Sequence, residues 1–138
     1  MEGAGKAMRN DDLAKRFVAF HLSHPEIWEA YEQVILDNIE GGRSRGGVKE
    51  VTETIRWGRY RQPARIDNRH HPFYARMFAC AHPEHKDYFE YKSSAADYIS
   101  YEPLLDLVCV REPKMRDRVA EEALGWEDPQ LSLELHGG

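Results

Sequence analysis

The sequence predicts a mostly α-helical protein. Residues 1–92 are expected to form a compact, winged-helix-like domain with a short extended wing, and residues 93–138 an acidic helical extension packed on it or flanking it. In several segments apolar residues recur at the spacing of one helix face, and proline or glycine bounds these segments. Charge is divided unevenly: residues 43–76 contain nine basic and three acidic residues, whereas residues 93–138 contain four basic and ten acidic ones.

The first helix is expected to follow a frayed polar lead, residues 1–10. Asn10 or Asp11 can cap this helix, and its apolar residues recur at helical spacing. These residues are Leu13, Phe17 and Phe20. His21 lies beside them and fits a half-buried, hydrogen-bonded histidine better than one half of a nucleophile–histidine pair.

A second helix is expected over residues 24–39. Ser23 and Glu26 have the spacing of a capping box, in which each side chain accepts a hydrogen bond from the backbone N–H of the other residue. Pro25 falls in the first turn, where its missing N–H costs no hydrogen bond. The glycine-rich residues 41–47 end this helix and are expected to form a flexible loop.

Three further elements are expected before the acidic extension. Residues 48–60 have one apolar stripe and predict a helix that presents a basic and aromatic edge. In residues 61–72 apolar residues do not recur at helical spacing. Their prolines indicate an extended segment, which we interpret as a two-stranded wing. A short helix is expected over residues 73–81, and Pro83 begins another turn or two.

The acidic extension is expected to contain two helices. The first covers residues 95–110 and is kinked or restarted at Pro103, because proline cannot continue a helix without losing a hydrogen bond. The second covers residues 114–124 and is stopped by Gly125. The last residues, 128–138, are expected to be loose.

Composition narrows the class of protein. With 138 residues and 41% hydrophobic residues, the chain can bury a core without disulfides or metals. Cys80 and Cys109 both lie in apolar surroundings, so we expect two reduced, buried thiols in a cytoplasmic protein. No apolar run approaches the length of a membrane helix, and the first residues do not form a signal peptide.

The basic residues 43–76 are interleaved with aromatic residues, a composition that binds phosphates and stacks on bases. A helix followed by a basic wing is also a known way to dock on duplex DNA. The residues predicted to contact nucleic acid are Arg43, Arg45, Lys49, Arg56, Arg59, Tyr60, Arg65, Arg69 and Arg76.

Other interpretations of the same residues stay open. The basic stretch can be neutralised by the protein's own acidic extension, since blocks of charge are often self-paired. Arg56 and Arg76 fit a structural role at helix carboxyl ends or beside buried acids. For Trp57, the sequence favours burial in the core over a role as a base-stacking surface, because large aromatic side chains are mostly buried.

A group of histidines suggests a metal site only weakly. The candidates are His70, His71, His82 and His85. Their surroundings resemble a ββα-metal nuclease in part, but lack its full histidine motif and any paired cysteines for a structural zinc. No cofactor is predicted.

Several short strings, in order, resemble a small protein family of unknown function that is encoded by phages and prophages. The resemblance covers about residues 13–91 and leaves the acidic extension unmatched. It departs from the family at Ser23-His24, where Asn-Pro is common, and at Tyr91-Lys92, where an arginine often follows. The strings are Phe17-Val-Ala-Phe20-His21, Pro25, Ile55-Arg56-Trp57, Asn68, Phe73-Tyr74-Ala75-Arg76, Pro83 and Phe89-Glu90. The resemblance implies a compact helical domain in the cytoplasm of a host bacterial cell.

Together these observations predict a non-catalytic protein that binds nucleic acid, with DNA as the expected partner, in a phage or mobile-element setting. An alternative is an inhibitor that binds a host enzyme or defence complex, with its acidic extension mimicking nucleic acid. A third is a metal-dependent nuclease that uses the histidines. The sequence predicts no membrane partner, and it does not predict an oligomeric state.

Overall fold

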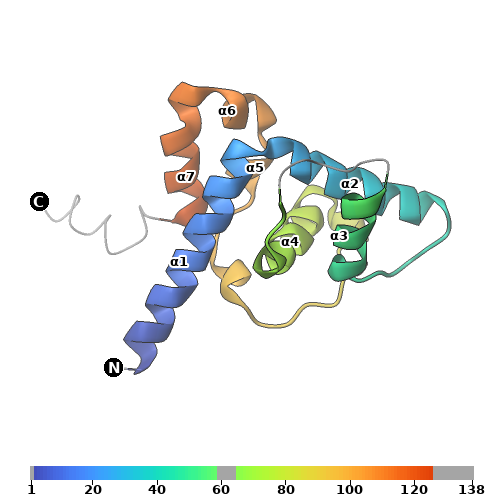
Figure 1. Ribbon diagram of the computed structural model, residues 1–138, viewed down its shortest axis with the longest axis horizontal. Helices are drawn as coiled ribbons and strands as arrows, with labels where there is room; N and C mark the ends of the chain where they lie inside the picture. The colour runs from blue at the N-terminus through green and yellow to red at the C-terminus, as the bar shows by residue number, and fades with distance from the viewer. Residues whose placement is uncertain (1, 59–64, 126–138) are drawn as a thin grey trace, which may run out of the picture.

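The computed structural model describes residues 2–58 and 65–125, and their side chains from Asp12 onward. These residues form seven α-helices and four 3-10 turns, and no strand occurs among them. The mostly helical prediction is therefore confirmed. Helix α4 lies in the middle of the molecule, with α3 on one side and α1 on the other (Figure 1).

Helices α1 (Glu2–Ser23) and α2 (Pro25–Glu40) meet at His24. The prediction of a frayed lead over residues 1–10 was wrong, since α1 begins at Glu2. The predicted capping box is also absent: Ser23 is the last residue of α1, and the His24 N–H donates to the Phe20 carbonyl at 2.8 Å. Because α1 continues to Ser23, that hydroxyl is not at the N-cap, and His24 takes this position without a side-chain hydrogen bond.

Helices α3 (Val48–Trp57) and α4 (His71–Ala81) have the apolar stripes that the sequence predicts. Val51 and Ile55 of α3 are buried, as are Phe73, Tyr74, Met77 and Phe78 of α4. The predicted wing is not supported. Residues 65–67 are irregular and Asn68–His70 form a 3-10 turn, while residues 59–64 lie outside the described residues.

The C-terminal half is a series of short helices rather than two longer ones. A 3-10 turn at Ala95–Tyr98 precedes α5 (Glu102–Leu105) and α6 (Leu107–Arg111), and a second turn at Pro113–Met115 leads into α7 (Arg116–Leu124). The predicted restart at Pro103 occurs, because Pro103 lies in the first turn of α5. Gly125 ends α7 in the left-handed conformation, with φ of 68°, as predicted.

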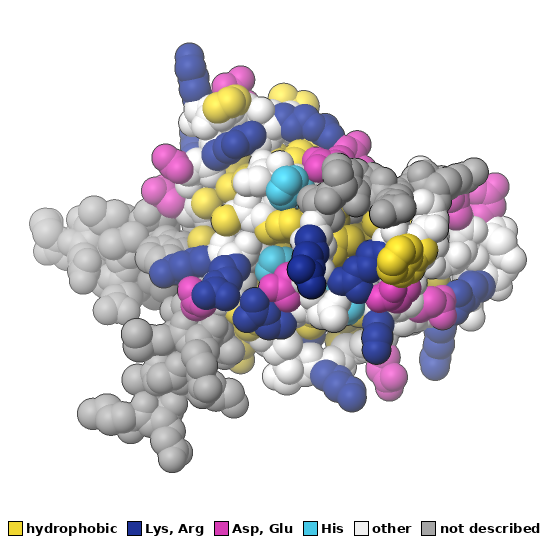
Figure 2. Space-filling model, in the orientation of Figure 1, with side chains coloured by type: hydrophobic (Ala, Val, Ile, Leu, Met, Phe, Trp, Pro, Cys, Tyr) yellow, Lys and Arg dark blue, Asp and Glu magenta, His cyan; other side chains and the backbone are white. Residues whose placement is uncertain are grey.

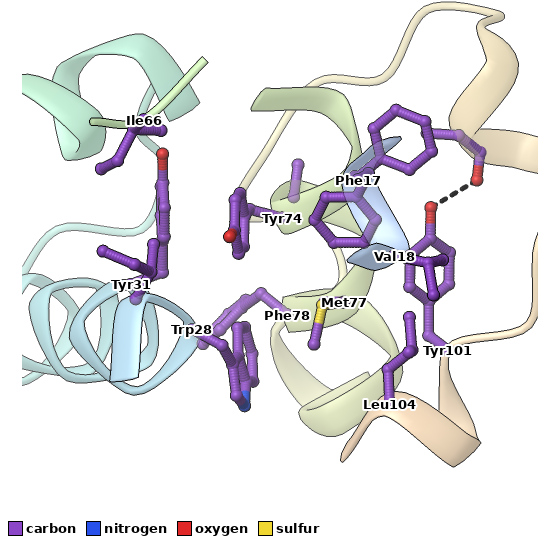
Figure 3. Close-up of a cluster of buried hydrophobic side chains, with 14 of the residues drawn as sticks. Phe17, Val18, Trp28, Tyr31, Ile66, Tyr74, Met77, Phe78, Tyr101 and Leu104 are labelled. Carbon is purple, nitrogen blue, oxygen red and sulfur yellow. Dashed lines mark hydrogen bonds between the residues drawn. The ribbon is translucent and has the colours of Figure 1, made fainter. Parts of the chain in front are cut away.

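One apolar core is shared by residues on both sides of position 92. In Figure 3 the ring of Tyr74 lies between Tyr31 and Phe17, and Leu104 and Tyr101 approach Val18 and Met77 from the C-terminal half. The Tyr31 and Tyr74 rings stack with their centroids 4.2 Å apart, and Phe17 meets Tyr74 edge to face at 5.0 Å. The change of charge near residue 92 is therefore not a boundary between two cores.

The loop over residues 41–47 is fixed at one end. The Gly46 N–H donates to the Tyr88 carbonyl at 3.0 Å, and the Asn38 side-chain amide donates to the Tyr88 hydroxyl at 3.2 Å. A Cβ atom on Gly46 would lie 2.7 Å from Cζ of Tyr88, a buried residue, so glycine is needed for this close approach.

Replacing Gly46 by alanine is expected to lower the free energy of unfolding by about 1–3 kcal/mol, since the new methyl group must displace the Tyr88 ring. Urea denaturation of the variant would measure this change. Gly47→Ala is the matched control, because a Cβ there meets nothing within 4 Å and the change loses only the preference of an N-cap for glycine over alanine, about 0.5–1 kcal/mol. Equal denaturation midpoints for the two variants would contradict the close packing of Gly46.

Among the described residues, no helix has both the length and the apolar character needed to cross a membrane.

Candidate nucleic-acid interface

Four of the predicted nucleic-acid contacts form salt bridges within the protein. Arg43 pairs with Glu50, Arg56 with Glu53 at 2.6 Å, Arg69 with Asp67 at 2.7 Å, and Arg76 with Asp97 at 2.6 Å. Hydrogen bonds from these arginines lower the pKa of each of the four carboxyl groups. Three of the four acids belong to the basic stretch itself, so these pairs neutralise it mainly from within rather than from the extension.

Arg76 has a structural position. Only 12% of its side chain is exposed, and Nε donates to Asp97. Its two terminal nitrogens donate to the Lys92 carbonyl at 2.6 Å and the Pro72 carbonyl at 3.0 Å. The guanidinium also lies 5.3 Å from the centroid of the Tyr91 ring. These contacts join α4 to the segment that begins the C-terminal half, so Arg76 is not part of the interface proposed below.

Arg56 joins α3 to the segment before α4. One of its terminal nitrogens donates to Glu53, and the other donates to the Ile66 carbonyl at 2.8 Å and to the Asn68 side-chain oxygen at 2.7 Å. Five N–H groups in a rigid fork allow one arginine to hold several acceptors at once. The structural interpretation of Arg56 therefore agrees with its contacts.

Trp57 lies on the surface, so the expectation that it is buried was wrong. Its side chain is 75% exposed at the end of α3. The indole N–H donates to the second oxygen of Glu53 at 3.0 Å, one helical turn back. Glu53 is not among the site residues predicted from the sequence, although its spacing of three residues from Arg56 and four from Trp57 is the signal for such contacts on a helix.

The remaining described cations of the stretch are exposed. Lys49 lies on α3, and its positive charge adds to the hydrogen bond from Arg56 in lowering the pKa of Glu53. Arg65 is the residue directly before Ile66. Arg45 lies apart, in a shallow hollow that contains Asp87 and Glu90. The predicted contacts Arg59 and Tyr60 lie outside the described residues. Figure 2 shows Lys and Arg side chains in a broken band across one face, with acidic side chains among them.

We call the set of Lys49, Glu53, Arg56, Trp57 and Arg65 the α3 surface. Its three cations exceed its single acid, and its aromatic ring is largely exposed. Guanidinium and ammonium groups bind phosphate oxygens, and an exposed indole can stack on a planar base. This set therefore has the chemical groups that nucleic acids require.

The four candidate histidines occupy two environments. His70 and His71 are buried where the 3-10 turn meets α4. His70 packs against the rings of Phe17, Phe20 and Phe73. Burial lowers the pKa of His70 to about 4 and also lowers the pKa of His71.

His82 and His85 lie near the other end of α4. The Nε2 atom of His82 is 2.7 Å from a carboxylate oxygen of Glu32, and its ring stacks on Phe78 at 4.8 Å. In the part of the chain that the structure describes, no three His, Cys, Asp or Glu side chains come close enough together to hold a metal ion. The described residues therefore give no metal site that supports the nuclease hypothesis.

Three other residues differ from the sequence expectations in how deeply they are buried. His21 is fully buried rather than half-buried, with Nε2 2.8 Å from the Leu104 carbonyl oxygen, and burial lowers its pKa to about 4. Cys80 and Cys109 are free thiols but only partly buried. Burial raises the pKa of Cys80, which is typical of an unreactive thiol.

Comparison with known proteins gave no match to a family model, to a curated protein or to a solved structure. The resemblance to phage and prophage proteins, and the setting that it implies, therefore stay predictions.

Proposed function

We propose that this protein binds nucleic acid without catalysis, and that the α3 surface makes the contact. The observation that carries the proposal is an exposed Trp57 among Lys49, Arg56 and Arg65, on a helix that the core holds through Val51 and Ile55. Cations position a nucleic acid through its phosphates, and the helix gives them a rigid support. DNA is the partner that the basic and aromatic composition favours, and the sequence resemblance implies a phage or mobile-element setting.

The number of available cations limits the salt dependence. Because Arg56 is paired with Glu53, the available cations are Lys49 and Arg65, and two phosphate contacts give a slope of log affinity against log salt of about −1.8 for duplex DNA and about −1.4 for single strands. Between 50 and 200 mM salt, the affinity is therefore expected to fall roughly 7- to 12-fold. Binding is expected to survive a chelator, since the proposed contacts need no metal.

Fluorescence anisotropy with labelled 20-residue oligonucleotides, at several salt concentrations, tests the proposal. A variant with Lys49→Gln and Arg65→Gln is expected to bind more weakly at 50 mM salt and to have a shallower salt slope. The matched control is Lys114→Gln with Arg116→Gln, because these two exposed residues lie near the start of α7, away from α3 (Figure 1).

Two results would contradict the proposal. One is the absence of binding by the pure, folded protein, which would favour the alternative of a protein inhibitor. The other is equal weakening by the α3 variant and the control variant, which would indicate attraction by overall charge rather than by this surface.

A further inference from the structure

We propose that the α3 surface recognises an unpaired base, which stacks on the indole ring of Trp57. This inference rests on the proposed function and narrows its ligand to single-stranded nucleic acid. The groups that carry it are the exposed ring, the contacts that fix its position and the neighbouring cations.

Hydrogen bonds hold the Trp57 ring in a defined place. Its N–H donates to Glu53, whose other oxygen accepts from Arg56. Arg56 in turn donates to the Ile66 carbonyl and to Asn68, which belong to the segment before α4. An aromatic ring fixed before binding loses little conformational freedom when a base stacks on it, so more of the stacking energy appears as affinity.

The neighbouring cations suit a strand that passes over this ring. Lys49, Glu53 and Trp57 follow one another at intervals of four residues, so Lys49 lies about two turns before Trp57 and roughly 80° around α3 from it. Arg65 is the residue before Ile66 in the chain. The Ile66 carbonyl accepts a hydrogen bond from Arg56. Lys49 and Arg65 are both exposed, so the phosphates of a strand that crosses the α3 surface could reach these cations.

The exposed position of Trp57 favours an unpaired base over a duplex. Inside a duplex both faces of each base are covered by its neighbours, so a ring on the protein surface cannot stack there without unstacking them. A single strand presents free base faces, and stacking on an aromatic side chain is worth about 1–3 kcal/mol for each base. The ligand chemistry is shared by single-stranded DNA and single-stranded RNA.

The test measures the affinity of wild type, Trp57→Phe and Trp57→Leu for single-stranded DNA, single-stranded RNA and duplex DNA of the same length and sequence. Wild type is expected to bind at least one single strand more tightly than the duplex. Trp57→Leu is expected to bind that strand about 5- to 150-fold more weakly, which is the loss of one stacked base, whereas Trp57→Phe retains part of the affinity. Tyr98→Leu is the matched control, because Tyr98 is equally exposed, at 73%, but lies in the C-terminal half.

The outcomes separate this inference from the proposed function. If duplex and single strands bind equally and Trp57→Leu changes neither affinity, the inference fails while the proposed function stands. If Tyr98→Leu weakens binding as much as Trp57→Leu, stacking at this position is also contradicted. If no nucleic acid binds, the proposed function and the inference fail together. Equal melting temperatures for wild type and both Trp57 variants would confirm that exposed-site changes leave the fold intact.

Discussion

A chain that ends at Lys92 is expected to lose its cooperative fold. Removal of the C-terminal half takes Tyr101, Leu104, Val110 and Val119 out of the core, and it removes the carbonyl group that binds His21. Deleting one large buried side chain typically costs about 2–5 kcal/mol, and a whole domain is stable by only about 5–15 kcal/mol. The summed loss exceeds what the remaining residues can supply.

Thermal and urea unfolding of the shortened chain, followed by circular dichroism, would measure this effect. The matched control is a chain that ends at Gly125, which keeps every described core residue. A cooperative transition in the chain that ends at Lys92 would contradict the shared core. The expected result also means that deleting the whole acidic extension cannot test its role as a nucleic-acid mimic, because loss of function would only report loss of fold.

Lowering the pH from 7.5 to 5 is expected to destabilise the protein by about 4 kcal/mol through His21 and His70, and the lowered pKa of His71 adds to this loss. His21 and His70 each have a pKa near 4 in the folded protein and an ordinary value of 6.5 when unfolded. Between these two values the unfolded chain binds more protons, so stability is fully present above pH 6.5 and is lost as the pH falls towards 4. At pH 5 the loss is about 2 kcal/mol for each histidine.

The charged and hydrogen-bonding groups around His21 and His70 do not reverse the loss of stability at low pH. Glu26 and the Leu104 carbonyl raise the pKa of His21, and Asp67 raises that of His70, but burial outweighs them in both cases. Arg111 beside His21 lowers its pKa further, as Arg69, His71 and Arg16 do for His70. The paired carboxyl groups have unfolded pKa values of 3.8 and 4.5, so most of their contribution to stability is lost only below pH 5.

Urea denaturation at pH 7.5 and pH 5 would measure the difference. His70→Phe is expected to remove about 2 kcal/mol of the pH dependence, because a phenyl ring suits its aromatic surroundings and cannot bind a proton. His24→Gln is the matched control, since it changes a half-buried histidine beside Phe20 and leaves His21 and His70 in place. Equal stability at the two pH values, or an undiminished dependence in His70→Phe, would contradict the proposed cause.

Local patterns predicted the helices that have strong local signals. The apolar spacing of residues 73–78 identified α4, and the glycines at positions 41 and 125 ended α2 and α7 as expected. The capping box failed for a reason that no local pattern contains. Ser23 and Glu26 have the correct spacing, but α1 continues to Ser23 and the bend falls at His24.

The candidate site was predictable in composition but not in geometry. The basic stretch contains Lys49, Arg56 and Arg65, as the sequence indicated, yet charge counting did not show that Arg76 joins α4 to the C-terminal half. Trp57 was misjudged because its burial depends on what lies beyond the end of α3. Only the arrangement of distant segments decides whether a tryptophan at a helix end meets the core or the solvent.

The hydrogen bond between His21 and Leu104 joins residues 83 positions apart, and α1 lies beside α7 (Figure 1). During synthesis at about 5–20 residues per second, roughly 4–17 s separate the appearance of these two residues. For that time the apolar side of α1 lacks part of its final partners, because Leu104, Val110 and Val119 do not yet exist, although Phe73 and Tyr74 are already made. The nascent chain is therefore expected to need protection from aggregation until α7 is made, and to complete the shared core only afterwards.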